Sequence, residues 1–222
     1  MTRGRFIVLE GLDGAGTTTQ AERLAAALRA RGLTVRVTRQ PSDGPVGSLL
    51  RHALTGRVGL PQSRGPLSED TLALLFAADR IDHLRATVEP ALEAGEIVLC
   101  DRYVLSSLAY QGSSLPMAWV EAINGRALKP DLTLFLEVDV GVAAKRRAAR
   151  GAAQELYEAD ERQARIAKQY LAAIRRRSGK ERIVRVDGTK PVEEVTQAAL
   201  AVLDRALSLK GTRARRKGRG TA

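Results

Sequence analysis

The stretch FIVLEGLDGAGTTTQ, Phe6 to Gln20, joins an apolar, partly β-branched segment to a glycine-rich turn and a helix-like segment. This order is typical of the P-loop, G-x-x-x-x-G-K-[ST], whose backbone N–H groups surround phosphate oxygens. Gly11, Gly16 and Thr18 hold the expected spacing, but Thr17 occupies the position of the lysine. The stretch therefore predicts a strand, a phosphate-binding turn without its usual ammonium group, and a helix.

The whole turn is a candidate ATP-binding site, because the helix that follows would add a favourable dipole to the backbone N–H groups. In this geometry the Thr18 hydroxyl reaches Mg²⁺. The alternative is a glycine-rich turn that binds no ligand. The candidate residues are Gly11, Leu12, Asp13, Gly14, Ala15, Gly16, Thr17, Thr18 and Thr19.

Short apolar runs alternate with longer helical patterns along the rest of the chain. This alternation predicts an α/β fold with a five-stranded parallel sheet and helices on both faces. Gly32, Gly95 and Gly151 mark helix ends, and Pro191 marks a helix start. The expected strands are residues 5–10, 34–39, 96–100, 132–138 and 182–187. The expected helices are residues 17–32, 68–95, 140–151, 158–177 and 191–209, with an irregular segment at 55–68.

The composition indicates one globular domain, residues 1–209, within a chain of 222 residues. No apolar run is long enough to cross a bilayer, and the first residues show no signal-peptide pattern. A single cysteine, Cys100, excludes an internal disulfide and a cysteine cluster for zinc, and is interpreted as a buried core thiol. These features predict a cytoplasmic protein with no membrane partner.

The net charge of +11 is concentrated at the C-terminus. Residues 210–222, KGTRARRKGRGTA, carry six basic side chains, and removing them leaves +5. This segment has no apolar residue beyond alanine and is predicted to be a disordered basic tail. No aromatic side chain is interleaved with the charges, so a solubilising tail is favoured over a dedicated nucleic-acid site.

Two further motifs carry candidate functional groups. In EIVLCDRY, Asp101 ends an apolar strand, where a P-loop protein places a carboxylate near the metal, and Arg102 can meet a phosphate. A helix cap and a surface ion pair are the alternative. In LLFAADR, Phe76 and Arg80 lie on one helix face, where a ring can stack on a base and a guanidinium can bond its edge. A core phenylalanine beside an exposed arginine is the alternative.

The ordered segments FIVLEGLDGAG, TRQP, LLFAADR, LCDRYVLSSLAYQG and KPDLTLFLEV resemble the thymidylate kinase family, over about residues 6–207. The resemblance implies ATP-dependent phosphorylation of dTMP to dTDP with Mg²⁺, and a homodimer. It implies that Phe76 stacks on thymine and that Arg80 donates a hydrogen bond to the edge of the base. Further implied roles are nucleoside contacts by Ser106, Ser107, Tyr110 and Gln111, monophosphate contacts by Arg51 and Arg102, an acidic group at the acceptor phosphate from Asp13, and metal contacts by Thr18 and Asp101.

Three positions depart from the family pattern: Thr17 replaces the lysine, Gln40 replaces the glutamate of TREP, and the lid, about residues 147–160, lacks its Asp-Arg pair. Arg147 and Arg150 could replace the lysine charge as catalytic groups, as could the neighbouring Arg146. A solvated basic helix face is the alternative. A kinase for another nucleoside monophosphate and a catalytically impaired nucleotide-binding protein therefore remain as rival functions.

The sequence offers two further, weaker indications. The segment VDGTKPVEEV resembles the loop beside adenine in nucleoside monophosphate kinases. An ordinary turn followed by a helix start is the alternative. His52 and His83 have no identifiable partner cluster, so both are predicted to lie on the surface.

Overall fold

The computed structural model describes residues 3–56, 66–149 and 156–207. Its centre is a parallel sheet of five strands in the order β2-β3-β1-β4-β5, which confirms the predicted fold class. The strands are β1 (Arg5–Gly11), β2 (Val35–Arg39), β3 (Ile97–Asp101), β4 (Leu132–Glu137) and β5 (Ile183–Asp187).

The three inner strands are almost continuously buried, which explains why their sequences are mainly apolar. Cys100 lies within this core, as predicted, and burial raises the pKa of its thiol. The register places Leu9 opposite Asp101 and Gly11 opposite Leu136. The carboxyl ends of β1, β3 and β4 therefore meet at one edge of the sheet, where α/β proteins bind their ligands.

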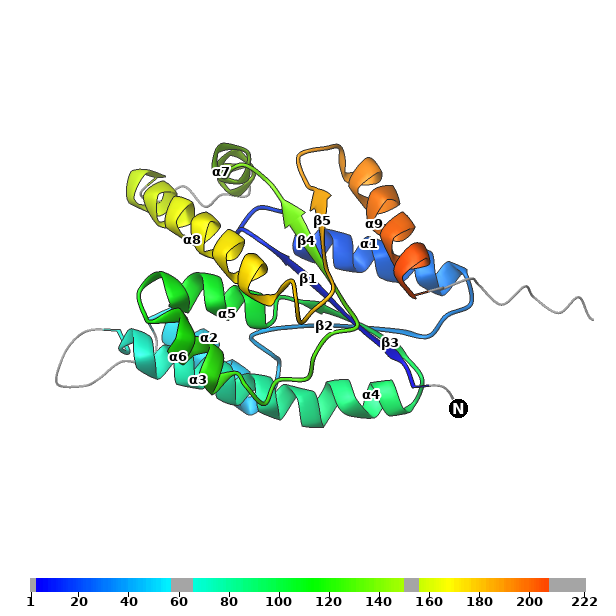
Figure 1. Cartoon of the computed structure of the whole chain (residues 1–222), viewed down its shortest axis with the longest axis horizontal. Helices are drawn as coiled ribbons and strands as arrows, with labels where there is room; N and C mark the ends of the chain where they lie inside the picture. The colour runs from blue at the N-terminus through cyan, green and yellow to red at the C-terminus, as the bar shows by residue number, and fades with distance from the viewer. Residues whose placement is uncertain (1–2, 57–65, 150–155, 208–222) are drawn as a thin grey trace, which may run out of the picture.

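Helices cover both faces of the sheet (Figure 1). Helices α1 and α9 pack together on one side, whereas α3, α4 and α5 lie on the other. The bounds are α1 (Thr17–Ala30), α2 (Pro45–Leu54), α3 (Glu69–His83), α4 (Glu89–Glu93), α5 (Val104–Tyr110), α6 (Met117–Ile123), α7 (Val140–Ala148), α8 (Leu156–Arg177) and α9 (Val192–Leu207).

The helix predicted for residues 68–95 is one continuous helical run, in which a π-helical segment, Leu84–Val88, joins α3 to α4. Gly32 and Gly95 follow helices with φ of +81°, the backbone region that favours glycine at a helix end. Helices α2, α5 and α6 have no counterpart in the prediction. Each has ten residues or fewer, too short for a helical period to stand out.

Several predicted features fall outside the described residues. These are residues 150–155 of the lid, which include Arg150 and Gly151, residues 57–65 of the irregular segment and the basic tail at 210–222. In the part of the chain that is described, no helix is long and apolar enough to cross a membrane.

Candidate active site

The glycine-rich turn connects β1 to α1 and borders a cavity of about 290 Å³. Gly14 has a φ of +95°, and a Cβ there would lie 2.5 Å from the Ala143 carbonyl oxygen, so only glycine fits. Leu12 and Ala15 are buried in the core, so these residues can meet a ligand only through their backbone. The N-terminus of α1, with Gly16 as its cap, has no side-chain cap bond among the described residues. Its N–H groups are thus oriented for an anion.

The residue in place of the P-loop lysine is buried. Thr17 is 5 % exposed and lines this cavity together with Thr18, while Thr19 lines a smaller cavity nearby. Among the described lining residues, the cationic side chains are Arg102 and Arg147. Any positive charge that these residues present to a bound phosphate therefore comes from guanidinium groups.

Asp101 lies at the carboxyl end of β3, beside the turn. Its Oδ2 accepts a hydrogen bond of 2.5 Å from Thr18 Oγ1. Its Oδ1 is buried and has no hydrogen-bond partner among the described residues. A buried carboxylate oxygen without a donor is rare, and it fits a site for a hard divalent cation.

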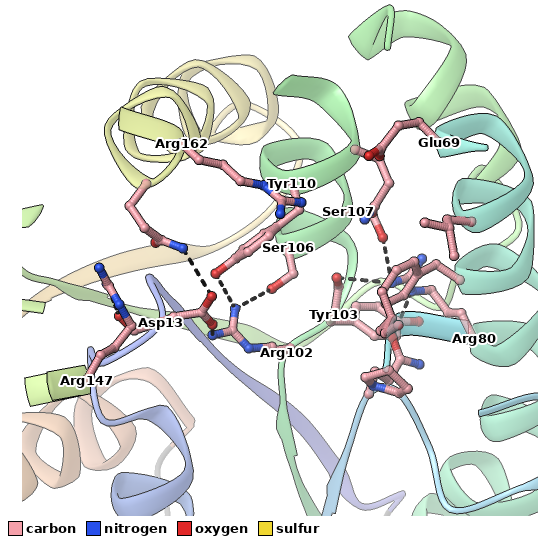
Figure 2. A pocket seen from close by; sticks show the side chains of 17 residues that line it. Asp13, Glu69, Arg80, Arg102, Tyr103, Ser106, Ser107, Tyr110, Arg147 and Arg162 are labelled. Atoms are coloured by element: carbon pink, nitrogen blue, oxygen red, sulfur yellow. Dashed lines mark hydrogen bonds and ion pairs between the residues drawn. The ribbon is translucent and has the colours of Figure 1, made fainter. Parts of the chain in front are cut away.

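Arg102 follows Asp101 with a φ of +69°, a backbone conformation that is uncommon for a residue with a side chain. This conformation turns the guanidinium back toward β1. Its Nη2 donates to Asp13 Oδ1 at 2.7 Å, and its Nη1 donates to the Gly11 carbonyl oxygen at 3.0 Å. Its guanidinium also lies 5.3 Å from the ring centroid of Tyr110. Asp13 and Arg102 are therefore held together at the mouth of the turn (Figure 2).

Glu10 is a fully buried carboxylate that the site prediction missed. Its Oε2 accepts from Ser106 Oγ at 2.6 Å and from Tyr170 Oη at 3.2 Å, and its Oε1 accepts from the Tyr103 N–H at 2.9 Å. Burial raises the pKa of Glu10, whereas the Ser106 hydrogen bond and the positive charge of Arg102 lower it. The charged residue inside an apolar strand was the signal available in the sequence.

A second cavity, of about 430 Å³, adjoins the first. Phe76 and Arg80 both line it, so the predicted shared helix face is correct. Figure 2 shows Arg80 and Ser107 at one end, and Asp13, Arg102 and Arg147 at the other. Further lining residues are Gln40, Pro41, Leu54, Glu69, Leu72, Tyr103, Ser106, Tyr110, Gln111, Arg162 and Gln163.

Arg80 is only 2 % exposed, which excludes the alternative of a surface arginine. Its Nε donates to Gln40 Oε1 at 3.0 Å and its Nη1 donates to Asn124 Oδ1. Its Nη2 donates to Ser107 Oγ at 3.0 Å and to the Tyr103 carbonyl oxygen at 3.1 Å. All four acceptors are neutral, and no carboxylate of the described residues pairs with this guanidinium. A buried cation of this kind is stabilised by a ligand with an electron-rich edge.

His83 corrects one of the sequence predictions. His52 is exposed as expected, but His83 is 3 % exposed, so its assignment to the surface was wrong. Its Nε2 lies 2.6 Å from Thr38 Oγ1 and its Nδ1 lies 3.2 Å from Gln40 Nε2. His83 is thus joined to Arg80 through Gln40.

The remaining predicted arginines occupy different places. Arg51 is not among the lining residues of either cavity, and its Nη1 donates to the carbonyl oxygens of Pro41 and Ser42. Arg147 lines both cavities, and its Nη1 donates to the Asp13 carbonyl oxygen at 2.9 Å.

Arg146 points elsewhere. Its Nη1 donates to the Gly188 carbonyl oxygen at 2.8 Å, in the loop after β5 that resembles an adenine-bordering loop. Gly188 and Lys190 line the smaller cavity with Arg146, beside Gly16 and Thr19.

A strand, a glycine turn and a helix N-terminus beside a carboxylate and guanidinium groups define a P-loop nucleotide-binding protein, and the adjoining cavity is suited to a second nucleotide. Residues 9–199 match the family model for thymidylate kinase. The chain therefore belongs to the thymidylate kinase family.

Individual relatives agree with this family. The chain is 42% identical over 170 residues to a probable thymidylate kinase of Pyrococcus abyssi, covering 76% of this chain and 82% of that protein. It is 41% identical over 221 residues to the thymidylate kinase of Alkalilimnicola ehrlichii, covering 96% of each chain. It is also 41% identical over 207 residues to that of Thermomicrobium roseum, covering 89% of this chain and 93% of that protein.

Proposed function

We propose that this protein transfers the γ-phosphoryl group of ATP to dTMP, with Mg²⁺ bound beside the P-loop. The observation that carries the proposal is that the two cavities share Asp13, Arg102 and Arg147. A nucleotide in each cavity would bring its phosphates to these three residues. Positioning two phosphates and offsetting their repulsion is most of what phosphoryl transfer requires from a protein.

The larger cavity is the proposed dTMP site. Phe76 stacks on the base, and Arg80 bonds its carbonyl edge. The four bonds of Arg80 to described residues use four of its five N–H groups, which leaves one at Nη1 for a ligand. Arg102, at the other end of the cavity, meets the monophosphate. Ser107, Tyr110 and Gln111 complete the nucleoside contacts.

The cavity of about 290 Å³ at the glycine-rich turn is the proposed site of the ATP phosphates. The turn residues bind them through backbone N–H groups at the start of α1. Thr18 and Asp101 would hold Mg²⁺, since Asp101 Oδ1 has no donor in the described residues. When bound, Mg²⁺ neutralises charge on the β- and γ-phosphates. We place adenine beside Arg146 and the loop at Gly188, because these residues line a cavity next to the turn.

Arg147 is the proposed replacement for the P-loop lysine. It lies on the wall that both cavities share, so its guanidinium can contact the group in transfer. This geometry favours an active kinase over an impaired nucleotide-binding protein. A guanidinium can also bond phosphate oxygens in a bidentate manner, which an ammonium cannot.

A coupled assay with ATP, Mg²⁺ and a panel of acceptors tests the function. We expect dTMP to give the highest kcat/KM among dTMP, dUMP, CMP, GMP and AMP. A higher value with another base would contradict the thymidylate assignment. Binding of ATP and dTMP without product would instead support the impaired protein.

We also propose a homodimer that forms through α2 and α3. These helices pack on each other and expose two leucines that line neither cavity, Leu49 at 43 % and Leu74 at 51 %. Light scattering at micromolar concentration should give the mass of two chains, and Leu74→Glu should shift it toward that of one chain. A monomeric mass for the unmodified protein would contradict the proposal, whereas an unchanged dimer of the variant would move the interface elsewhere.

Some expectations stay predictions. The roles of Arg51 and Arg150, the lid at about 147–160, the tail at 210–222 and the cytoplasmic location belong to this group. Arg51 would have to exchange its bonds to Pro41 and Ser42 for a phosphate.

A further inference from the structure

We propose that Gln40 and His83 form a positioning pair that orients the Arg80 guanidinium for the base of the acceptor nucleotide. The inference rests on the proposed function, because it assigns the ligand of Arg80 to a nucleobase. Gln40 is 5 % exposed and lines the dTMP cavity, while His83 lies behind it and does not. The hydrogen bonds that link His83 to Arg80 therefore run through Gln40.

The hydrogen bonds fix the orientation of the Gln40 amide. Arg80 Nε–H can only donate, so the atom that it contacts at 3.0 Å must be the oxygen, Oε1. The amide nitrogen of Gln40 consequently faces His83 Nδ1 at 3.2 Å and donates to it. Gln40 thus accepts a hydrogen bond from Arg80 through its amide oxygen and donates one to the His83 ring through its amide nitrogen.

This direction also fixes the state of His83. Because Nδ1 accepts a hydrogen bond, the proton of the neutral ring is on Nε2, which donates to Thr38 Oγ1 at 2.6 Å. A protonated ring would turn a second donor toward the Gln40 amide nitrogen. Burial lowers the pKa of His83, and the positive charge of Arg80 lowers it further, while Asp79, Asp82 and Asp43 oppose this effect. The environment therefore agrees with a neutral ring.

The pair explains a departure of this chain from its family's pattern. A glutamate at position 40 would place a negative charge against Arg80 and would require a proton on His83 Nδ1. Glutamine holds Arg80 in place without placing a negative charge directly against it, so only the more distant carboxylates of Glu10 and Asp79 offset the charge of the guanidinium. The remaining Nη1–H can then attract the electron-rich edge of a base.

Imidazole NMR tests the pair without any assay of activity. The chain has two histidines, so a long-range ¹H–¹⁵N spectrum of the untagged protein contains two imidazole signal sets, which His52→Gln assigns. We expect His83 to be the neutral Nε2–H tautomer near neutral pH. In Gln40→Glu the carboxylate cannot donate, so the proton should move to Nδ1. A proton on Nδ1 of unmodified His83, or the same tautomer in both proteins, would overturn the proposal.

Kinetics test the consequence for the base. Gln40→Leu removes the acceptor of Arg80 Nε and should raise KM for dTMP about tenfold or more, with little change in kcat, because base contacts are equal in the ground and transition states. Gln40→Glu keeps an acceptor for Arg80 and should stay closer to the unmodified KM. Glu22→Gln, an exposed residue of α1 that lines neither cavity, is the control and should change neither constant.

The outcomes separate the two proposals. Equal KM values for Gln40→Leu and the unmodified protein, or equal increases in both Gln40 variants, would refute the positioning role. If Gln40→Leu fails to fold, the His83 tautomer in the unmodified protein and in Gln40→Glu still tests the positioning pair. If the unmodified protein does not phosphorylate dTMP, the proposed function fails, while the tautomer test of the pair remains valid.

Discussion

Arg147→Ala should lower kcat with dTMP by about 100- to 1000-fold, the effect of removing one preorganised donor from a developing anion. The reason is that Thr17 supplies no cation, and that Arg147 lies where the two cavities meet. The KM for dTMP should change much less, because charge on the group in transfer matters most in the transition state. Steady-state kinetics at saturating ATP and Mg²⁺ measure both constants.

Thr17→Lys provides the complementary test. In the unmodified protein the new ammonium would compete with a guanidinium already in place, so kcat should rise little. In the Arg147→Ala background the same lysine should restore much of the lost activity. Lys145→Ala, an exposed cation on the same helix, is the matched control and should be neutral. A large gain from Thr17→Lys alone, with a silent Arg147→Ala, would show that nothing had replaced the lysine.

Asp101→Asn should raise the Mg²⁺ concentration needed for half-maximal rate by about 10- to 100-fold, the usual effect of losing an oriented carboxylate at a metal site. The substitution keeps the shape of the side chain and an oxygen that can accept the hydrogen bond from Thr18. It removes the negative charge of the carboxylate, to which the buried Oδ1 belongs. Titration of the rate with Mg²⁺ at constant ATP measures the shift.

The control for this prediction is Asp131→Asn. Asp131 accepts hydrogen bonds from the Phe6 N–H and from Arg5 at the amino end of the sheet, away from the site. Its loss should affect stability without affecting the Mg²⁺ dependence. If Asp101→Asn retains the Mg²⁺ dependence of the unmodified protein, the metal is held by other groups.

The sequence by itself determined the sheet and the glycine-rich turn. Buried parallel strands need near-continuous apolar runs, and a helix needs an apolar stripe along one face. Both patterns can be recognised from residues that lie close together in the chain. The turn is equally local, because its three glycines and its three threonines lie within nine consecutive residues. Phe76 and Arg80 could be paired for the same reason, since one helical turn separates them.

The tertiary structure alone decided which side chains meet. Arg80 contacts Gln40, Asn124 and Ser107, which belong to three other segments of the chain. No spacing in the sequence predicts these contacts. The burial of His83 is also decided by the tertiary structure, because the sequence around a single histidine on a helix does not indicate whether the side chain faces solvent or another element. Tyr170 of α8 reaches the Glu10 carboxylate of β1 across the fold.

Arg147 and Arg146 illustrate the same distinction within one helix. They are adjacent in sequence, yet one donates to Asp13 and the other to Gly188. Successive residues of a helix point about 100° apart, so the packing of α7 against the turn decides which arginine reaches the shared wall. Composition and spacing indicate that a cation is available, but only the arrangement of distant elements specifies where its charge is placed.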